Sequence, residues 1–255
     1  MNETLKPIIE HPPKIWTPEE KLELLVNGKN VVFQFPAFGP YLYNHVVKQV
    51  LAKGQRLPTG KEIAYMIHRI YESNQLDNSI GPIRDMMKSM LWVPVRNIWT
   101  PKSVKNPGVY TIHDENGLGL SGKIDILQLE DILIGSSIER RVRFSRDRKV
   151  CFAPLDTITP GTLKKGTLSQ DGAFISNYGI EGAEKLDQFT QMLGVFPFSY
   201  VFNNCSDKPV QTLSTLRRDV VLNAHMLSAG FCSNGGNSGY VVSISGSDQI
   251  VGESK

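Results

Sequence analysis

The sequence predicts an α+β protein, with an N-terminal helical region followed by a mainly antiparallel β region that holds one or two further helices. Two observations favour this class. Amphipathic segments with helix-start signals fill the first 91 of the 255 residues, and segments rich in β-branched and aromatic residues follow. We therefore expect a mainly helical region over 1–91 and a β-rich region over 92–255, packed as one compact domain or two, with a loop or linker near 153–166.

The first predicted elements are two helices with a strand between them. Thr17 and Glu20 stand at capping-box spacing around a proline, and Gly28 supplies a stop, which predicts a helix over 18–27. Residues 31–35 are a short apolar run and a candidate strand. Pro40 can start the next helix, whose apolar residues recur at helical spacing until Gly54.

Two further helices complete the N-terminal region. Thr59 and Glu62 form a second capping box before an amphipathic run over 63–71. A shorter helix is expected over 82–91, with a β pair after it. This arrangement loosely resembles a winged helix-turn-helix, but the connection between the helices exceeds the roughly 3–4-residue turn of that motif. A generic helical bundle is therefore the favoured interpretation.

The β region begins with strands over 92–99 and 109–113, and Asn116-Gly117 marks a tight turn. One helix is expected over 180–193. Further strands are expected in segments rich in β-formers, near residues 198–202, 210–216, 219–231 and 240–244.

The positive charge of the chain is concentrated in residues 138–149. Six cations and two acids lie there, which leaves 22 of the 28 basic and 23 of the 25 acidic residues for the rest of the chain. A focused cluster of this kind makes a local field that can hold an anion. The six cations are Arg140, Arg141, Arg143, Arg146, Arg148 and Lys149.

This basic segment reads as a β-hairpin. Val142 and Phe144 fall on one face of its first strand, Arg141 and Arg143 on the other, and the chain returns over 149–152. Arginine side chains grip phosphate oxygens in pairs. Our leading hypothesis is a non-catalytic binding protein that holds nucleic acid or another acidic partner on this hairpin. The structural alternative is a solvated strand edge whose charge prevents aggregation.

The alternative function is a hydrolase-type enzyme. His113, Asp114 and Glu115 place an imidazole beside two carboxylates, the groups that general acid–base chemistry uses. A second candidate is the Gly235–Gly239 loop, which is similar to the Gly-Asn-Ser-Gly-Gly nucleophile loop of trypsin-like proteases. Tyr240 replaces the last glycine, and His225 lies only 13 residues before Ser238, so a glycine-rich hairpin loop is the expectation.

Composition narrows the remaining classes. The three cysteines at 151, 205 and 232 form no C-x-x-C pair and the histidines are scattered, so we expect no metal site and no cofactor. No signal-like start or apolar run of ~18 residues is present, which favours a cytoplasmic protein that does not enter a membrane. A third hypothesis, an assembly or structural subunit, rests on aromatic-rich segments over 33–43 and 196–202 and keeps a homo-oligomer open.

Overall fold

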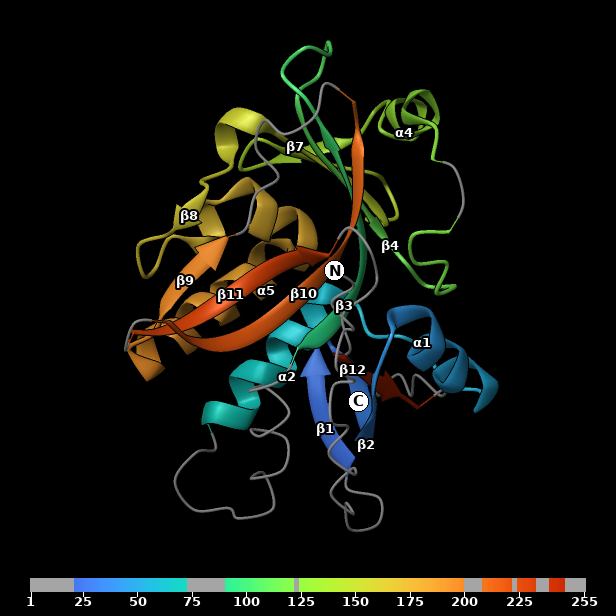
Figure 1. Cartoon of the computed structure of the whole chain (residues 1–255), viewed down its shortest axis with the longest axis vertical. Helices are drawn as coiled ribbons and strands as arrows, with labels where there is room; N and C mark the ends of the chain where they lie inside the picture. The colour runs from blue at the N-terminus through green and yellow to red at the C-terminus, as the bar shows by residue number, and fades with distance from the viewer. Residues whose placement is uncertain are drawn as a thin grey trace, which may run out of the picture.

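The computed structural model describes residues 21–72, 90–121, 124–199, 208–221, 224–232 and 239–245 (Figure 1). The helices are α1 (Tyr43–Ala52), α2 (Gly60–Glu72), α4 (Ile126–Ile132) and α5 (Gly172–Leu193), with short 3₁₀ turns η2 (Leu155–Thr157) and η3 (Leu168–Gln170). The first six strands are β1 (Lys21–Val26), β2 (Lys29–Tyr41), β3 (Leu91–Thr100), β4 (Gly108–His113), β5 (Ser137–Glu139) and β6 (Val142–Phe144). The others are β7 (Val150–Pro154), β8 (Gly161–Thr162), β9 (Phe196–Ser199), β10 (Val210–Val221), β11 (Ala224–Cys232) and β12 (Gly239–Ile244).

A curled, mostly antiparallel sheet organises the molecule. Its strand order is β5-β6-β7-β4-β3-β10-β11-β9-β8, and β12 joins β3 to the pair β1–β2. The pairs β11–β9 and β12–β3 are parallel. Every residue of β3 is buried, because this strand lies in the interior of the sheet.

Helices cover the sheet and close the core. α5 packs on β4, β6 and β7, α2 packs along α5, and α1 packs on β2 and β12 (Figure 1). The largest apolar cluster joins β1, β2 and β3 to the buried faces of α2 and α5. Phe33, Ile67 and Phe189 have no exposed surface there. The two helices and the sheet therefore share one core.

The capping box at the start of α2 is confirmed atom by atom. The Thr59 hydroxyl accepts a bond from the Glu62 amide at 3.1 Å, and the Glu62 carboxylate accepts one from the Thr59 amide at 2.7 Å. Arg56 also donates to both carboxylate oxygens of Glu62, at 3.0 and 2.7 Å. The local signal and the tertiary contact thus fix the same helix start.

The α+β class is confirmed, but the helix-first order is only partly met. The helix predicted over 18–27 is wrong for the described residues, because 21–26 form β1. Asn27 and Gly28 adopt φ of 55° and 74° and join β1 to β2 as a tight hairpin turn. Asn-Gly is a strong signal for such a turn, and it outweighed the capping-box pattern upstream.

Most other elements lie where the sequence placed them. The helices starting near Pro40 and Thr59 and the strands over 92–99, 109–113 and 240–244 are confirmed. The helix predicted over 180–193 is longer and starts at Gly172. The helix predicted over 82–91 and the winged helix-turn-helix fall largely outside the described residues.

The boundary proposed between two regions falls within β3 and the loop after it. β3 pairs with β4 and β10 and touches β12, so this strand lies between sheet partners from both regions. The linker proposed over 153–166 contains η2 and β8, and β8 pairs with β9. The division into one domain or two stays a prediction.

Replacing Thr59 with Ala should lower the free energy of unfolding by about 1 kcal/mol, because the Glu62 amide loses its hydroxyl acceptor. Urea unfolding monitored by circular dichroism measures the change. Thr59→Ser keeps the hydroxyl and should retain most of the stability. Equal losses of unfolding free energy in both variants would contradict a role for the hydroxyl hydrogen bond.

Candidate functional site

A polar pocket lies between the sheet and the kink of α5. Its volume is about 520 Å³. The floor comes from β3, β4, β6 and β7, the walls from the start of α2 and the middle of α5, and the rim from the turns at 115 and 147–149. The pocket therefore unites segments that are distant in the sequence, and four of the predicted site residues line it: His113, Glu115, Arg148 and Lys149.

A buried network of polar side chains supports the floor. The Asn97 amide nitrogen donates to the Ser214 hydroxyl at 2.6 Å. The Asn97 oxygen accepts bonds from Thr111 at 3.1 Å and from Asn177 at 3.2 Å. Ser214 in turn donates to the Asn177 oxygen. Thr111 and Asn177 also line the pocket, so its floor is polar in a region that is otherwise core.

The walls depend on two glycines. Gly179 has φ 68° and ψ 168°, which interrupts α5 where residues 176–181 line the pocket. Gly60 starts α2 against α5, and a Cβ there would lie 2.0 Å from the Asn177 carbonyl oxygen. Only glycine allows that approach, so the contact between α2 and α5 sets the width of the pocket.

The rim carries ion pairs of both signs. They are Lys149 with Glu115 at 2.8 Å, Lys61 with Glu181 at 2.8 Å, and Arg148 with Glu139. The Arg148 guanidinium also lies 5.1 Å from the centroid of the Phe144 ring. With Asp147 included, the pocket lining holds four acidic residues and three basic ones. The pocket is therefore close to electrically balanced and is not a strongly positive site.

Pairing shifts the ionisation of two rim groups. A hydrogen bond to Glu115 raises the pKa of the Lys149 ammonium, and bonds from Lys61 and Tyr65 lower the pKa of the Glu181 carboxyl. Each charged state is thus favoured by its partner.

His113 is a half-buried titratable group of the pocket lining. Its Nδ1 lies 3.1 Å from the Pro94 carbonyl oxygen. Because that oxygen can only accept, Nδ1 carries the proton and Nε2 is left as an acceptor in the neutral ring. Burial lowers the pKa of His113, and the Glu115 charge offsets only part of this effect. The ring is therefore a neutral hydrogen-bonding group at pH 7.

Two other candidates for chemistry are held in structural roles. Asp114 is buried outside the pocket, where it accepts bonds from the Tyr43 hydroxyl at 2.9 Å and from the amides of Leu118 and Gly119. Cys151 lines the pocket, but burial raises the pKa of its thiol to about 12. Asp114 and His113 are neighbours in the sequence, but their side chains point in opposite directions, and only His113 lines the pocket.

The remaining basic residues do not converge on the pocket. Arg140 pairs with Glu184 at 2.8 Å, Arg141 pairs with Asp156, and Arg143 pairs with Glu130 at 2.8 Å. Glu130 also accepts bonds from Tyr110 and Asn106, so the Arg143 pair anchors α4 to the sheet. Arg146 has no ion pair with any described residue. Acidic partners thus offset five of the six cations.

The basic segment forms two consecutive hairpins. Val142 and Phe144 are buried, as predicted, and β6 pairs with β7. The placement of Arg141 on a strand is wrong: Arg140 and Arg141 form the turn between β5 and β6, with φ of 48° and 68°. The neighbouring turn is fixed by Ser145, whose hydroxyl donates to Asp147 at 2.7 Å and accepts from the Val150 amide.

Sequence reasoning missed the α5 wall. Ser176, Asn177 and Tyr178 line the pocket, yet they lie before the predicted start of the helix. Asp171 gave the signal, because its side chain caps α5 by accepting from the Ala173 and Phe174 amides. Of the Gly235–Gly239 loop, residues 235–238 lie outside the described residues.

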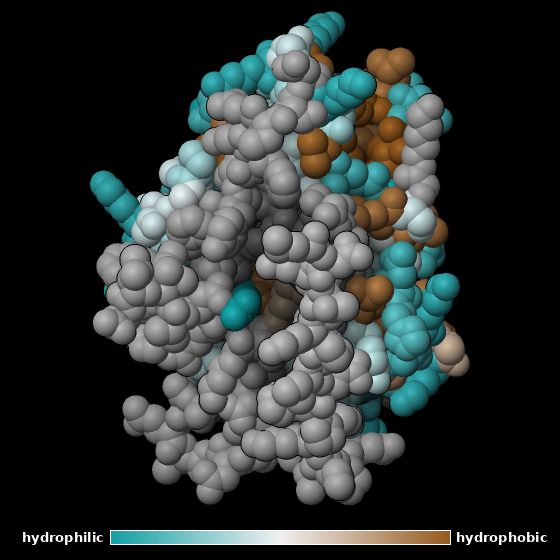
Figure 2. Space-filling view, viewed as in Figure 1, coloured by the Kyte–Doolittle hydropathy of each residue, from teal (hydrophilic) through white to brown (hydrophobic). Residues whose placement is uncertain are grey.

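The assembly hypothesis remains a prediction. Phe33 and Phe35 of the aromatic-rich segment belong to the core, and Tyr41 is half exposed. Exposed aliphatic side chains instead occur on α4 and β5, and Figure 2 shows brown atoms near the position of α4. They include Leu127 on α4 and Ile138 on β5, and Ile134 in the turn after α4 is exposed too.

Membrane spans and metal sites can be stated for the described residues. No helix among them has the length and apolar character to cross a bilayer. In that same part of the chain, His, Cys, Asp and Glu side chains form no group of three or more suited to a metal ion.

Comparison with known proteins gives a likeness in fold. No protein-family model and no curated protein matches the chain. A solved structure from the work "Accommodation of massive sequence variation in Nanoarchaeota by the C-type lectin fold" is similar, with a TM-score of 0.51 and 13% sequence identity. The match covers 89% of this chain and 99% of that chain. At this identity the similarity concerns the arrangement of helices and strands alone.

Replacing Asn97 with Ala should lower the free energy of unfolding by at least about 2 kcal/mol, since Thr111, Ser214 and Asn177 lose a buried partner. Chemical denaturation measures this loss. Asn116→Ala, at an exposed turn position, should stay within about 0.5 kcal/mol of the wild type. An unchanged free energy of unfolding in Asn97→Ala would mean that the network does not constrain the fold.

Acidification should destabilise the protein through His113. Its pKa in the folded state lies below the ordinary 6.5, so the unfolded chain takes up the proton first as pH falls. The contribution of the neutral His113 ring to stability is complete above pH 6.5 and is lost as the pH falls below that value, with a slope of up to ~1.4 kcal/mol per pH unit. Urea titrations at several pH values should show a shallower loss in His113→Asn, which removes the titrating ring. Identical slopes would contradict the assignment.

Proposed function

We propose that this chain is a non-catalytic binding protein whose polar pocket takes a small zwitterionic ligand. The observation that carries the proposal is the pairing of a fixed polar floor with a rim of both charge signs. Thr111 and Asn177 are held by the buried network, and the rim offers Glu115 and Lys149 side by side. Groups fixed in this way lose little entropy when a ligand binds.

The charge of the pocket favours a zwitterion over an anion. Four acidic residues face three basic ones, so a purely anionic ligand would meet net repulsion. A ligand with an ammonium and a carboxylate can exchange partners with a rim pair. Lys149 and Glu115 are each about half exposed, at 50% and 46%, and such surface pairs are worth only about 0–1 kcal/mol.

Binding without catalysis fits the chemical groups of the pocket. His113 donates to Pro94 and keeps one acceptor nitrogen, whereas the Cys151 thiol stays protonated because burial raises its pKa to about 12. Asp114 lies outside the pocket and cannot orient the His113 ring. The hydrolase remains an alternative hypothesis, with His113 as base and Glu115 as the nearest carboxylate on the pocket.

The fold comparison is consistent with a recognition role. The similar structure is described as accommodating massive sequence variation by the C-type lectin fold. A scaffold that tolerates variation in this way suits binding sites built from loops and turns. In this chain the rim of the polar pocket comes from such turns, around Glu115 and Asp147.

Thermal unfolding with a panel of free amino acids tests the proposal. A ligand at ~100 times its dissociation constant should raise the melting temperature by about 5 °C or more. The corresponding amino-acid amides, which lack the carboxylate, should bind more weakly. The double variant Glu115→Gln with Lys149→Gln should lose the effect.

A matched control is Lys21→Gln with Glu23→Gln, two exposed charges on β1 that do not line the pocket. It changes the charge by the same amount and should respond to ligands as the wild type does. No stabilisation by any zwitterion, or the same stabilisation in both double variants, would reject the pocket as the binding site.

The second candidate function is the binding of nucleic acid or another polyanion by the basic segment. One observation favours it: Arg146 has no ion pair with a described residue, and the Arg141 and Arg148 side chains are 65% and 57% exposed. Exposed pairs exchange partners at little cost. We assign Arg143 no binding role, because its guanidinium is paired with the Glu130 carboxylate.

Retention on heparin over a salt gradient tests this second function. The variant Arg141→Ser, Arg146→Ser and Arg148→Ser should elute at lower salt than the wild type, because fewer counterions are released on binding. Arg143 stays in place so that α4 keeps its anchor. Elution of both proteins together at low salt would leave the segment as a solvated edge.

A further inference from the structure

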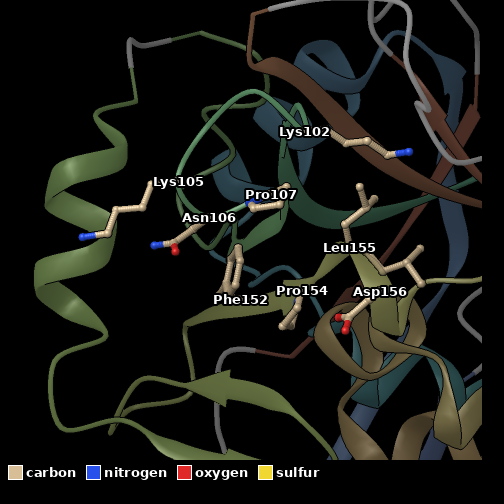
Figure 3. Close-up of a pocket in the computed structure, with 9 residues that line it drawn as sticks. Lys102, Lys105, Asn106, Pro107, Phe152, Pro154, Leu155 and Asp156 are labelled. Carbon is tan, nitrogen blue, oxygen red and sulfur yellow. The ribbon is translucent and has the colours of Figure 1, made fainter.

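A second hollow lies on the opposite face of the sheet from the polar pocket. We name it the lysine-rimmed pocket; its volume is about 780 Å³ (Figure 3). Cys151 of β7 faces the polar pocket and Phe152, the next residue, faces this one. Successive side chains of a strand point to opposite faces, so the two sites are separate.

The floor of this pocket is apolar. Figure 3 shows the Phe152 ring between Asn106 and Pro154, with Pro107 and Leu155 beside it. The Arg143 guanidinium lies 4.6 Å from the centroid of the same ring. Phe152 is only 5% exposed and also packs against Tyr110, so the apolar surface open to a small molecule comes mainly from the half-buried Pro107, Pro154 and Leu155.

Specific contacts hold the walls together. A Cβ on Gly108 would lie 2.2 Å from the Ala153 carbonyl oxygen and 3.0 Å from the Phe152 ring, so only glycine lets the loop close on β7. The Leu155 amide donates to the Pro107 carbonyl oxygen at 3.0 Å. Thr100 donates to the Asn106 carbonyl at 2.8 Å. The hollow is thus a built feature of the fold.

The rim is positively charged. Lys102 and Lys105 are exposed, and neither forms an ion pair with a described residue. Figure 3 shows their ammonium groups extending to opposite sides of Pro107. The acid of the lining, Asp156, is paired with Arg141. The two lysines therefore leave a net positive charge on either side of the apolar floor, whereas the lining of the polar pocket is close to balanced.

We propose that the lysine-rimmed pocket binds a small organic anion, a molecule with an aromatic or aliphatic body and one carboxylate, sulfonate or phosphate. The body lies against Pro107, Pro154 and Leu155, and the anionic group meets Lys102 or Lys105. This site is independent of the ligand proposed for the polar pocket. The positive charge of Lys102 and Lys105 is available to a ligand, whereas the arginines that form ion pairs already have acidic partners.

Fluorescence titration with anilinonaphthalene sulfonate tests the site, because this probe combines an aromatic body with a sulfonate. Lys102→Gln with Lys105→Gln should weaken binding about tenfold, which corresponds to ~1.4 kcal/mol. Leu155→Ser should also weaken it. The control Lys29→Gln with Lys48→Gln removes two exposed lysines outside the pocket and should bind as the wild type does.

Competition separates the contribution of the charge from that of the body. Naphthoate should displace the probe, whereas naphthamide, which lacks the charge, and inorganic phosphate, which lacks the body, should displace it at least about tenfold less well. Circular dichroism checks that each variant is folded. Unchanged probe affinity in the folded Lys102 and Lys105 double variant would overturn the proposal, as would equal displacement by phosphate and naphthoate.

Discussion

The buried hydrogen bonds around Asn97 are the constraint on which the rest of the structure depends. Asn97 on β3 links Thr111 on β4, Ser214 on β10 and Asn177 on α5. A buried amide left without partners costs about 1–3 kcal/mol, so the helix can rest on the sheet only where all these bonds form. Apolar contacts alone would tolerate sliding or rotation of α5, whereas directional bonds fix it.

The polar pocket follows from that fixed position. The carbonyl of Asn177 approaches Gly60 so closely that a Cβ would lie 2.0 Å away, which seats α2 against α5. Gly179 then interrupts α5 two residues later, where residues 176–181 line the pocket. His113 is consequently enclosed, and its burial follows from how the helix pair sits on the sheet. A change in the network would therefore alter the pocket as well as stability.

The charges show how folding can remove a pattern that is evident in sequence. Residues 138–149 hold the excess positive charge, yet four of the six cations meet acids from outside the segment, such as Glu184 on α5 and Glu130 on α4, and Arg148 pairs with Glu139 within it. The field of the cluster is thereby offset. Lys102 and Lys105, which form no ion pair with a described residue, lie instead in the loop between β3 and β4, where Ser103 and Val104 separate them and no concentrated cluster is evident.

The sequence by itself determined the elements whose signals are local. The capping box at Thr59 and the alternation of Val142 and Phe144 depend on neighbours a few residues away, and both appear as expected. Near Gly28 the capping-box pattern predicted a helix and the Asn-Gly pair predicted a turn, and the chain forms the turn. Tertiary structure decided the site: which residues face His113, that Asp114 turns away, and which acids meet the arginines. Those contacts join different elements of the fold, such as Tyr43 with Asp114 and Arg141 with Asp156, and local propensity carries no information about such pairs.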